Sequence, residues 1–157
     1  MLKQTTHAHK CPGSNIKVFN QDNQTLKSTT SHMKTSELGQ WPIQIKLVPV
    51  NAPFFKEASL LIAADCTAYA YGNFHDEFIK GRITLIGCPK LDTVDYSDKL
   101  TQILNENDIK SISIVRMQVP CCEGIVNAVK TAIKNSGKLI PWNVTVVSAE
   151  GEIISRL

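Results

Sequence analysis

The sequence lacks the signatures of several common functional classes. No apolar run approaches the ~18 residues of a membrane-spanning helix, and the leading MLKQTTHAHK has no signal-peptide core. Neither G-x-G-x-x-G nor G-x-x-x-x-G-K-[ST] occurs, so the usual phosphate-binding loops are missing. The absence of G-x-S-x-G argues against an α/β-hydrolase. We therefore expect a cytoplasmic protein with no membrane partner.

Charge of one sign and aromatic side chains are also scarce. The net charge is +3, no dense Lys/Arg block exists, and Phe, Trp and Tyr make up only 6% of the chain. Nucleic-acid binding would need a basic patch, and single strands would need a stacking platform as well. We therefore expect no nucleic-acid partner.

The length and composition of the chain predict one domain with a polar extension. The chain has 157 residues, of which 43% are hydrophobic, so it can bury a core without metal or disulfide staples. Residues 1–40 form a polar N-terminal segment that contains a Cys-Pro-Gly and a Ser/Thr/Asn/Gln-rich linker. Residues 41–157 form the predicted α/β body.

Within this body, strand patterns alternate with helix patterns. Strands are predicted at 43–50, 59–66, 82–88, 111–119 and 142–149. Helical segments are predicted near Asn51, at 67–81 as helix or helix plus loop, at 95–107, and at 121–137, where Gly137 suits a C-terminal cap. The alternation predicts a mostly parallel five-stranded sheet with helices on both faces, a Rossmann-like three-layer α/β fold.

The five cysteines are the first functional hint, because cytoplasmic cysteines more often bind metal or do redox chemistry than form disulfides. Cys66 and Cys88 end two predicted strands, and Cys121 and Cys122 follow a third. Ligands of open parallel sheets bind at the carboxyl ends of strands, which lie ~4.8 Å apart. These thiols are therefore predicted to share a metal site. The alternative is that they are small core residues.

Cys121 and Cys122 also lie at the expected start of the 121–137 helix. Helix N-termini favour negative charge and lower thiol pKa values, and Gly124 leaves room for close backbone approach. The alternative is a plain strand-to-helix turn with one buried cysteine.

Cys11 offers two further possibilities. His7, His9 and Cys11 alternate, so H-x-H-x-C can form a small metal site by itself. Alternatively, Cys11 folds over the sheet edge and completes a four-thiol set. His75 follows the strand that ends in Cys66 and is a weaker candidate ligand. The alternatives are a polar tail for His7 and His9, and an ordinary helix-surface position for His75.

Several strings together resemble a known family. WPIQIKLVPVNAPFF, LLIAADC, YGNFHDEF, GCPKLD and VRMQVPCC, with the leading HAHKCPGS, resemble the C-terminal domain of bacterial and archaeal 4Fe-4S ferredoxin-like, iron–sulfur-cluster-binding oxidoreductases. In that family an N-terminal module with two C-x-x-C-x-x-C-x-x-x-C-P motifs usually precedes the domain, and this sequence has none. The resemblance therefore implies metal binding and a separate electron-donor protein such as a ferredoxin.

These observations leave four functional hypotheses. The first is an iron–sulfur redox or electron-transfer domain, a possible oxidoreductase component, in which Cys66, Cys88, Cys121 and Cys122 hold the cluster and Cys11 substitutes or adds. The second is a zinc or other mononuclear site on the same thiols. The third is metal-free thiol or persulfide chemistry at Cys121 and Cys122. The last is a non-catalytic interaction domain.

Overall fold

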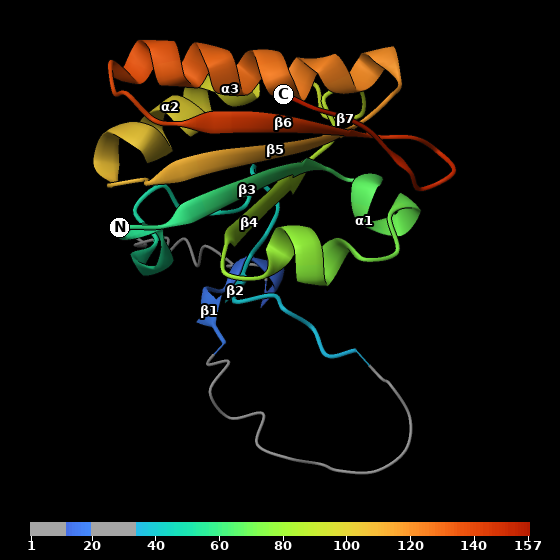
Figure 1. Cartoon of the computed structure of the whole chain (residues 1–157). Coiled ribbons are helices and arrows are strands. Elements are labelled where there is room, and N and C mark those ends of the chain that lie inside the picture. The colour runs from blue at the N-terminus through green and yellow to red at the C-terminus, as the bar shows by residue number, and fades with distance from the viewer. Residues whose placement is uncertain (1–11, 20–33) are drawn as a thin grey trace, which may run out of the picture.

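The computed structural model describes residues 12–19 and 34–157. Its centre is a five-stranded sheet with the order β4-β3-β5-β6-β7 (Figure 1). The first four strands in this order are parallel, and β7 is antiparallel to β6. The strands are β3 (Ser59–Ala64), β4 (Ile83–Gly87), β5 (Ser111–Met117), β6 (Trp142–Val147) and β7 (Ile153–Arg156). This sheet confirms the expected mostly parallel α/β fold.

Helices cover both faces of the sheet (Figure 1). Helices α2 (Tyr96–Glu106) and α3 (Glu123–Ser136) pack against each other on one face. Helix α1 (Thr67–Ala70) and a π-helical turn, η4 (His75–Ile79), lie on the other face. The 67–81 segment is therefore helix plus loop. Among the described residues, no helix is long and apolar enough to cross a membrane.

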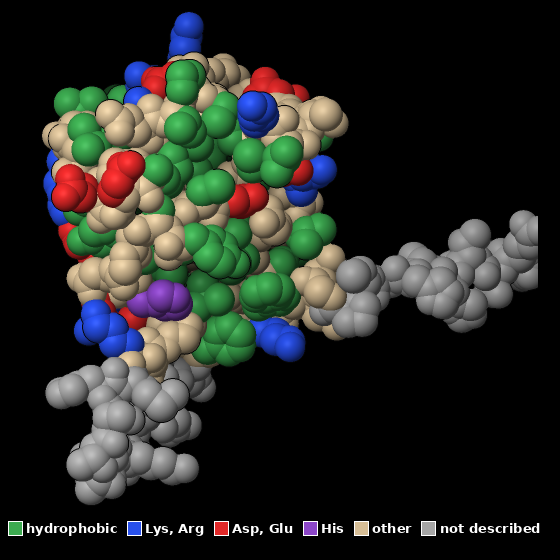
Figure 2. Space-filling view, turned by 90° about the vertical axis from the view of Figure 1, so that its right-hand side faces the viewer, with side chains coloured by type: hydrophobic (Ala, Val, Ile, Leu, Met, Phe, Trp, Pro, Cys, Tyr) green, Lys and Arg blue, Asp and Glu red, His purple; other side chains and the backbone are tan. Residues whose placement is uncertain are grey.

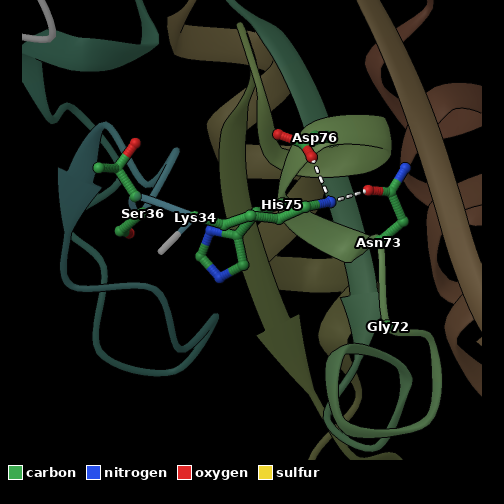
Figure 3. A pocket seen from close by; sticks show the side chains of 7 residues that line it. Lys34, Ser36, Gly72, Asn73, His75 and Asp76 are labelled. Carbon is green, nitrogen blue, oxygen red and sulfur yellow. Dashed lines mark hydrogen bonds and ion pairs between the residues drawn. The ribbon is translucent and has the colours of Figure 1, made fainter. Parts of the chain in front are cut away.

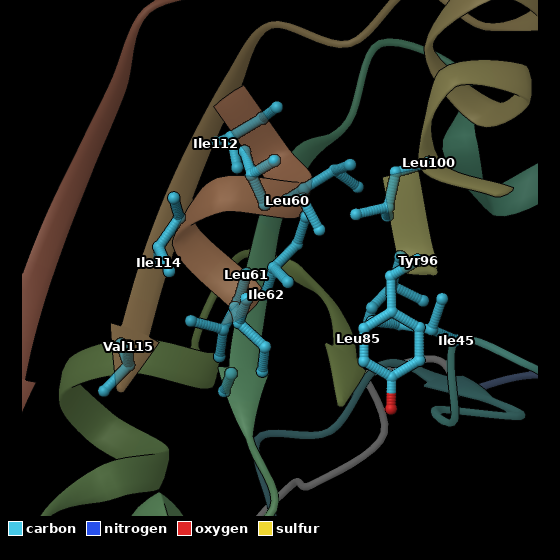
Figure 4. Packing of buried hydrophobic residues seen from close by; sticks show 14 of the residues in the cluster. Ile45, Leu60, Leu61, Ile62, Leu85, Tyr96, Leu100, Ile112, Ile114 and Val115 are labelled. Carbon is cyan, nitrogen blue, oxygen red and sulfur yellow. The ribbon is translucent and has the colours of Figure 1, made fainter. Parts of the chain in front are cut away.

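The core forms around β3, which is buried on both faces. Leu60, Leu61 and Ile62 are consecutive and at most 1% exposed. They lie beside Leu85 of β4 and Ile114 of β5 (Figure 4). A continuous apolar run suits a parallel strand between two helical layers, and each such side chain contributes roughly 1.5–3 kcal/mol by burial. The core therefore fixes the strands whose carboxyl ends carry the cysteines.

The strands at the edges of the sheet differ from the predicted ones. The predicted strand at 43–50 is not a strand: only Gln44 forms an isolated parallel bridge, to Ile86. Its buried residues are Ile45 and Val48, at the spacing of a turn rather than the alternation of a strand. The fifth strand is instead β7, which the sequence did not predict and which forms the edge of the sheet beside β6.

The segment before the sheet is tied to it by side chains. Strand β1 (Lys17–Val18) pairs with β2 (Gln40–Trp41) in a separate ribbon. The buried Gln40 side chain binds the backbone of Thr84 in β4, donating to its carbonyl at 2.5 Å and accepting from its N–H at 3.3 Å. The short helix predicted near Asn51 is the 3-10 turn η3 (Pro53–Phe55). The 34–58 segment thus packs onto the edge of the sheet at β4.

Replacing Gly137 by alanine is expected to lower the free energy of unfolding by about 1 kcal/mol. Gly137 ends α3 with a left-handed φ of 66°, as expected for a C-terminal cap, and alanine adopts that conformation at a cost. Urea denaturation measures the change. Gly39→Ala is the control, because a Cβ there meets no atom within 4 Å. Equal effects of the two substitutions would contradict this account of the cap.

Candidate functional site

The sheet order creates a topological switch point between β3 and β5. The chain moves from β3 outward to β4, then returns to place β5 on the other side of β3. In open α/β sheets, ligands bind at this switch point, beyond the carboxyl ends of the strands. Figure 2 faces the end of the molecule where β3 leads into α1, and hydrophobic side chains, among which the figure counts cysteine, spread across its middle.

The structure brings four cysteines to this end. Cys66 is the N-cap of α1 and is exposed, and Cys88 is the half-buried residue that directly follows β4. Cys121 and Cys122 lie in the 3-10 turn η5 (Pro120–Cys122) between β5 and α3, the first exposed and the second buried. All four are free thiols. The sequence-based placement at three strand ends is therefore correct in position.

Cys122 shows that thiols from two loops share one region. Burial raises the pKa of the Cys122 thiol, and a backbone contact with Met117 lowers it. The charge of Cys121, a hydrogen bond with the Cys121 thiol and the charge of Cys66 raise this pKa further. Cys66 follows β3 and Cys121 and Cys122 follow β5, and these two strands are neighbours in the sheet. We refer to these three residues at the β3/β5 switch point as the thiol cluster.

The Cys88 loop is held against the start of α3. A Cβ built on Gly124 would lie 2.9 Å from the Cβ of Pro89, the residue after Cys88. Real Cβ atoms do not approach so closely, so only glycine permits this contact without a shift. The expectation that Gly124 allows close approach is confirmed, and its partner is the loop that carries the fourth thiol.

Charged groups near the thiols were missed by sequence reasoning. Arg116, near the end of β5, is 19% exposed in its side chain and forms a 2.8 Å ion pair with Glu123 at the start of α3. Its Nη1 also donates to the Met117 carbonyl at 3.1 Å. A basic residue inside the apolar run SISIVRM was the available signal. Glu123 compensates the charge of Arg116, so the N-terminus of α3 is the feature that favours negative charge beside η5.

An acidic pair lies at the ends of β3 and β4. Burial raises the pKa of Asp65, a hydrogen bond with Gln44 lowers it, and the charge of Asp92 raises it. Tyr96 donates a 2.5 Å hydrogen bond to Asp92, and burial followed by this bond raises the Tyr96 pKa. A Cβ on Gly87 would lie 2.5 Å from the Tyr96 hydroxyl, so glycine at the end of β4 makes room for this pair.

The predicted metal ligands are only partly brought together. Among the described residues, no three His, Cys, Asp or Glu side chains are arranged so that they could hold a metal ion. His75 contacts the 34–38 segment: its Nδ1 accepts from the N–H of Glu37 at 3.1 Å. Beside it, Lys34 binds Asn73 and Asp76 (Figure 3). Cys11, His7 and His9 lie outside the described residues, so the H-x-H-x-C site remains a prediction.

The sheet order and its switch point place the chain in the class of open, mostly parallel α/β proteins. The chain belongs to the Rossmann-like domain family, whose model matches residues 52–157. An uncharacterized protein of Archaeoglobus fulgidus is 33% identical over 118 residues, which cover 74% of this chain and 83% of that protein. No solved structure matches the chain significantly. Neither match supports the iron–sulfur oxidoreductase family, so that resemblance remains a prediction.

Proposed function

We propose that Cys66, Cys88, Cys121 and Cys122 hold an iron–sulfur cluster at the carboxyl edge of the sheet and that the protein serves in electron transfer. The observation that supports this proposal is that four thiols follow the carboxyl ends of the neighbouring parallel strands β4, β3 and β5. Thiolates are the ligands that iron–sulfur clusters prefer. When bound, such a cluster would supply one-electron exchange.

The residues at this edge suit a thiolate-bound group in their chemistry, and their side chains would have to turn to bind it. Cys66 and Cys121 are exposed, so their χ1 angles can change without disturbing the core. That freedom matters because binding requires the thiols to turn toward a common centre. The Pro89–Gly124 contact keeps Cys88 close to the start of α3. Cys11 remains the proposed substitute or additional ligand.

The same thiols suit a tetrahedral zinc site. Iron, acid-labile sulfide and zinc measured on protein purified without oxygen, with the visible spectrum, test the proposal. Iron and sulfide in matching amounts with a brown colour are the expected result. Zinc without sulfide would replace the cluster by a mononuclear site, and the absence of any metal after anaerobic reconstitution would contradict both. If the protein carries the cluster, it would receive electrons from a separate donor protein, such as a ferredoxin.

Metal-free thiol chemistry is the second candidate, favoured by the hydrogen bond between Cys121 and Cys122. A thiolate of this cluster attacks a partner disulfide and forms a mixed disulfide. A second thiol of the cluster then attacks this mixed disulfide and releases the partner thiol. The partner disulfide gains two electrons and two protons, and this chain forms one disulfide. Mass spectrometry after exposure to oxidised glutathione would show the loss of two hydrogens between Cys122 and Cys121 or Cys66.

Metal affinity is expected to rise with pH between pH 6 and 8. Because burial raises the Cys122 pKa, this thiol keeps its proton at neutral pH in the metal-free protein, and a metal must displace that proton. Each displaced proton strengthens the apparent affinity by up to about tenfold per pH unit, until the pH passes the thiol pKa. Titration with Co²⁺, followed by thiolate-to-metal absorption, measures this slope. An affinity that does not change with pH would contradict thiolate binding.

A further inference from the structure

A second feature lies beside the thiols, on the sheet face that carries α1 and η4. A cavity of about 360 Å³ opens between the 38–43 segment and the carboxyl ends of β3 and β4. Its size falls within the roughly 300–1,000 Å³ of small-molecule sites. Its lining is mainly apolar and includes Leu38, Ala64, Phe74, Ile79 and Ile86.

Two polar atoms of the lining have no partner. Buried polar groups are normally hydrogen-bonded, and leaving one unpaired costs free energy. In the described part of the chain, three buried side-chain polar atoms lack a hydrogen bond, and two of them are Asp65 Oδ1 and Thr84 Oγ1, from residues that line this cavity. Thr84 is only 2% exposed, and its backbone is already satisfied by Gln40. Asp65 Oδ1 and Thr84 Oγ1 are therefore available to form hydrogen bonds with a ligand.

The charges around the cavity decide which ligand fits. Asp65 supplies a carboxylate, and Asp92 adds negative charge nearby. No lysine or arginine is among the described lining residues, and the His75 of the lining uses its Nδ1 to accept from the Glu37 N–H. An anionic ligand would face repulsion, whereas a nitrogen-centred donor would meet an acceptor that lacks a partner.

We propose that this cavity binds a small molecule with an apolar body and a cationic N–H donor group, such as an amine or amidine, that donates to Asp65 while its apolar part packs on Phe74 and Ile79. The Thr84 hydroxyl forms a hydrogen bond with a second polar atom of the same ligand. The proposal needs neither a metal nor the thiols, although Asp65 precedes Cys66 and a bound molecule would lie next to the thiol cluster.

Three probes of similar size and different charge test the proposal on the full chain. Benzamidine, benzyl alcohol and benzoate are titrated into ¹⁵N-labelled protein, and amide shifts are followed by NMR. Benzamidine is expected to bind most tightly, with a dissociation constant on the order of 1 mM for so small a molecule. Its shifts should centre on Asp65, Thr67, Ala68 and Thr84, and benzoate should cause none there. Shifts located elsewhere, or equal binding of the three probes, would overturn the proposal.

Variants separate the cavity from the rest of the surface. Asp65→Asn is expected to weaken benzamidine about tenfold while leaving benzyl alcohol unchanged. Asp98→Asn, at an exposed position of α2, is the matched control and should change neither. If Asp65→Asn does not fold, Ala68→Phe serves instead, because Ala68 is exposed, lines the cavity and would fill it. Full benzamidine affinity in Ala68→Phe would refute this site.

Discussion

Cys66→Ser is expected to remove most of the bound iron and sulfide while the protein stays folded. Cys66 is exposed, so the substitution disturbs little packing. It is also the N-cap of α1, and its side chain makes no capping bond that the substitution would remove. The free energy of unfolding of the metal-free variant should therefore change by no more than about 0.5 kcal/mol. Loss of metal without loss of stability is the signature of a ligand.

Cys88→Ser should have the same effect on metal content, because its loop lies against the start of α3. Ala68→Ser, two residues after Cys66 and exposed as Cys66 is, is the control that should keep the metal. Cys122 is a poorer test position, since it is buried and its replacement also changes packing. If Cys66→Ser and Cys88→Ser kept all of their metal and Cys11→Ser lost it, the H-x-H-x-C site would stand in place of the sheet-edge site.

Gly124→Val is expected to lower both the free energy of unfolding and the metal content. A single Cβ at Gly124 already lies 2.9 Å from the Pro89 ring, and valine adds two methyl groups that must displace the Cys88 loop or α3. Overpacking of this kind costs typically 1–3 kcal/mol. The displaced loop would also move Cys88 away from Cys121 and Cys122. Chemical denaturation and metal analysis measure the two effects.

Asn127→Val controls for the cost of a β-branched residue in a helix, because Asn127 is exposed on the same helix one turn later. It should cost only a few tenths of a kcal/mol, up to about 0.7, and keep the metal. Gly124→Ala should fall between the two, since one Cβ requires a smaller shift. A Gly124→Val protein that matches Asn127→Val in both measurements would show that the contact with Pro89 does not position the thiols.

The sequence predicted the inner part of this fold because burial there leaves a simple pattern. The run LLIAA reads as a strand covered on both faces, and α2 and α3 carry clear apolar stripes. The strands and turns at the edges of the sheet were harder to predict from the sequence. Residues 43–50 alternate in sequence, yet Ile45 and Val48 are buried by a turn, while β7 is a short edge strand whose sequence, IISR, carries little signal.

The positions of the thiols were likewise easier to predict from the sequence than the contacts around them. Cys66, Cys88, Cys121 and Cys122 could be placed because each directly follows a strand pattern or opens a helix. The Pro89–Gly124 contact, the Arg116–Glu123 ion pair and the hydrogen bond of Tyr96 to Asp92 join residues from different parts of the chain or depend on packing. Such contacts depend on how the loops cross above the sheet, which no local pattern records.

X-ray absorption at the edge of the bound metal tests the central claim most directly, because it counts the ligand atoms. Coordination by these thiols predicts about four sulfur scatterers at roughly 2.3 Å for each metal atom, and a lower average number of sulfur scatterers in any Cys66→Ser protein that keeps metal. A first shell dominated by nitrogen or oxygen at roughly 2.0–2.2 Å would contradict it and would place the metal away from the carboxyl edge of the sheet.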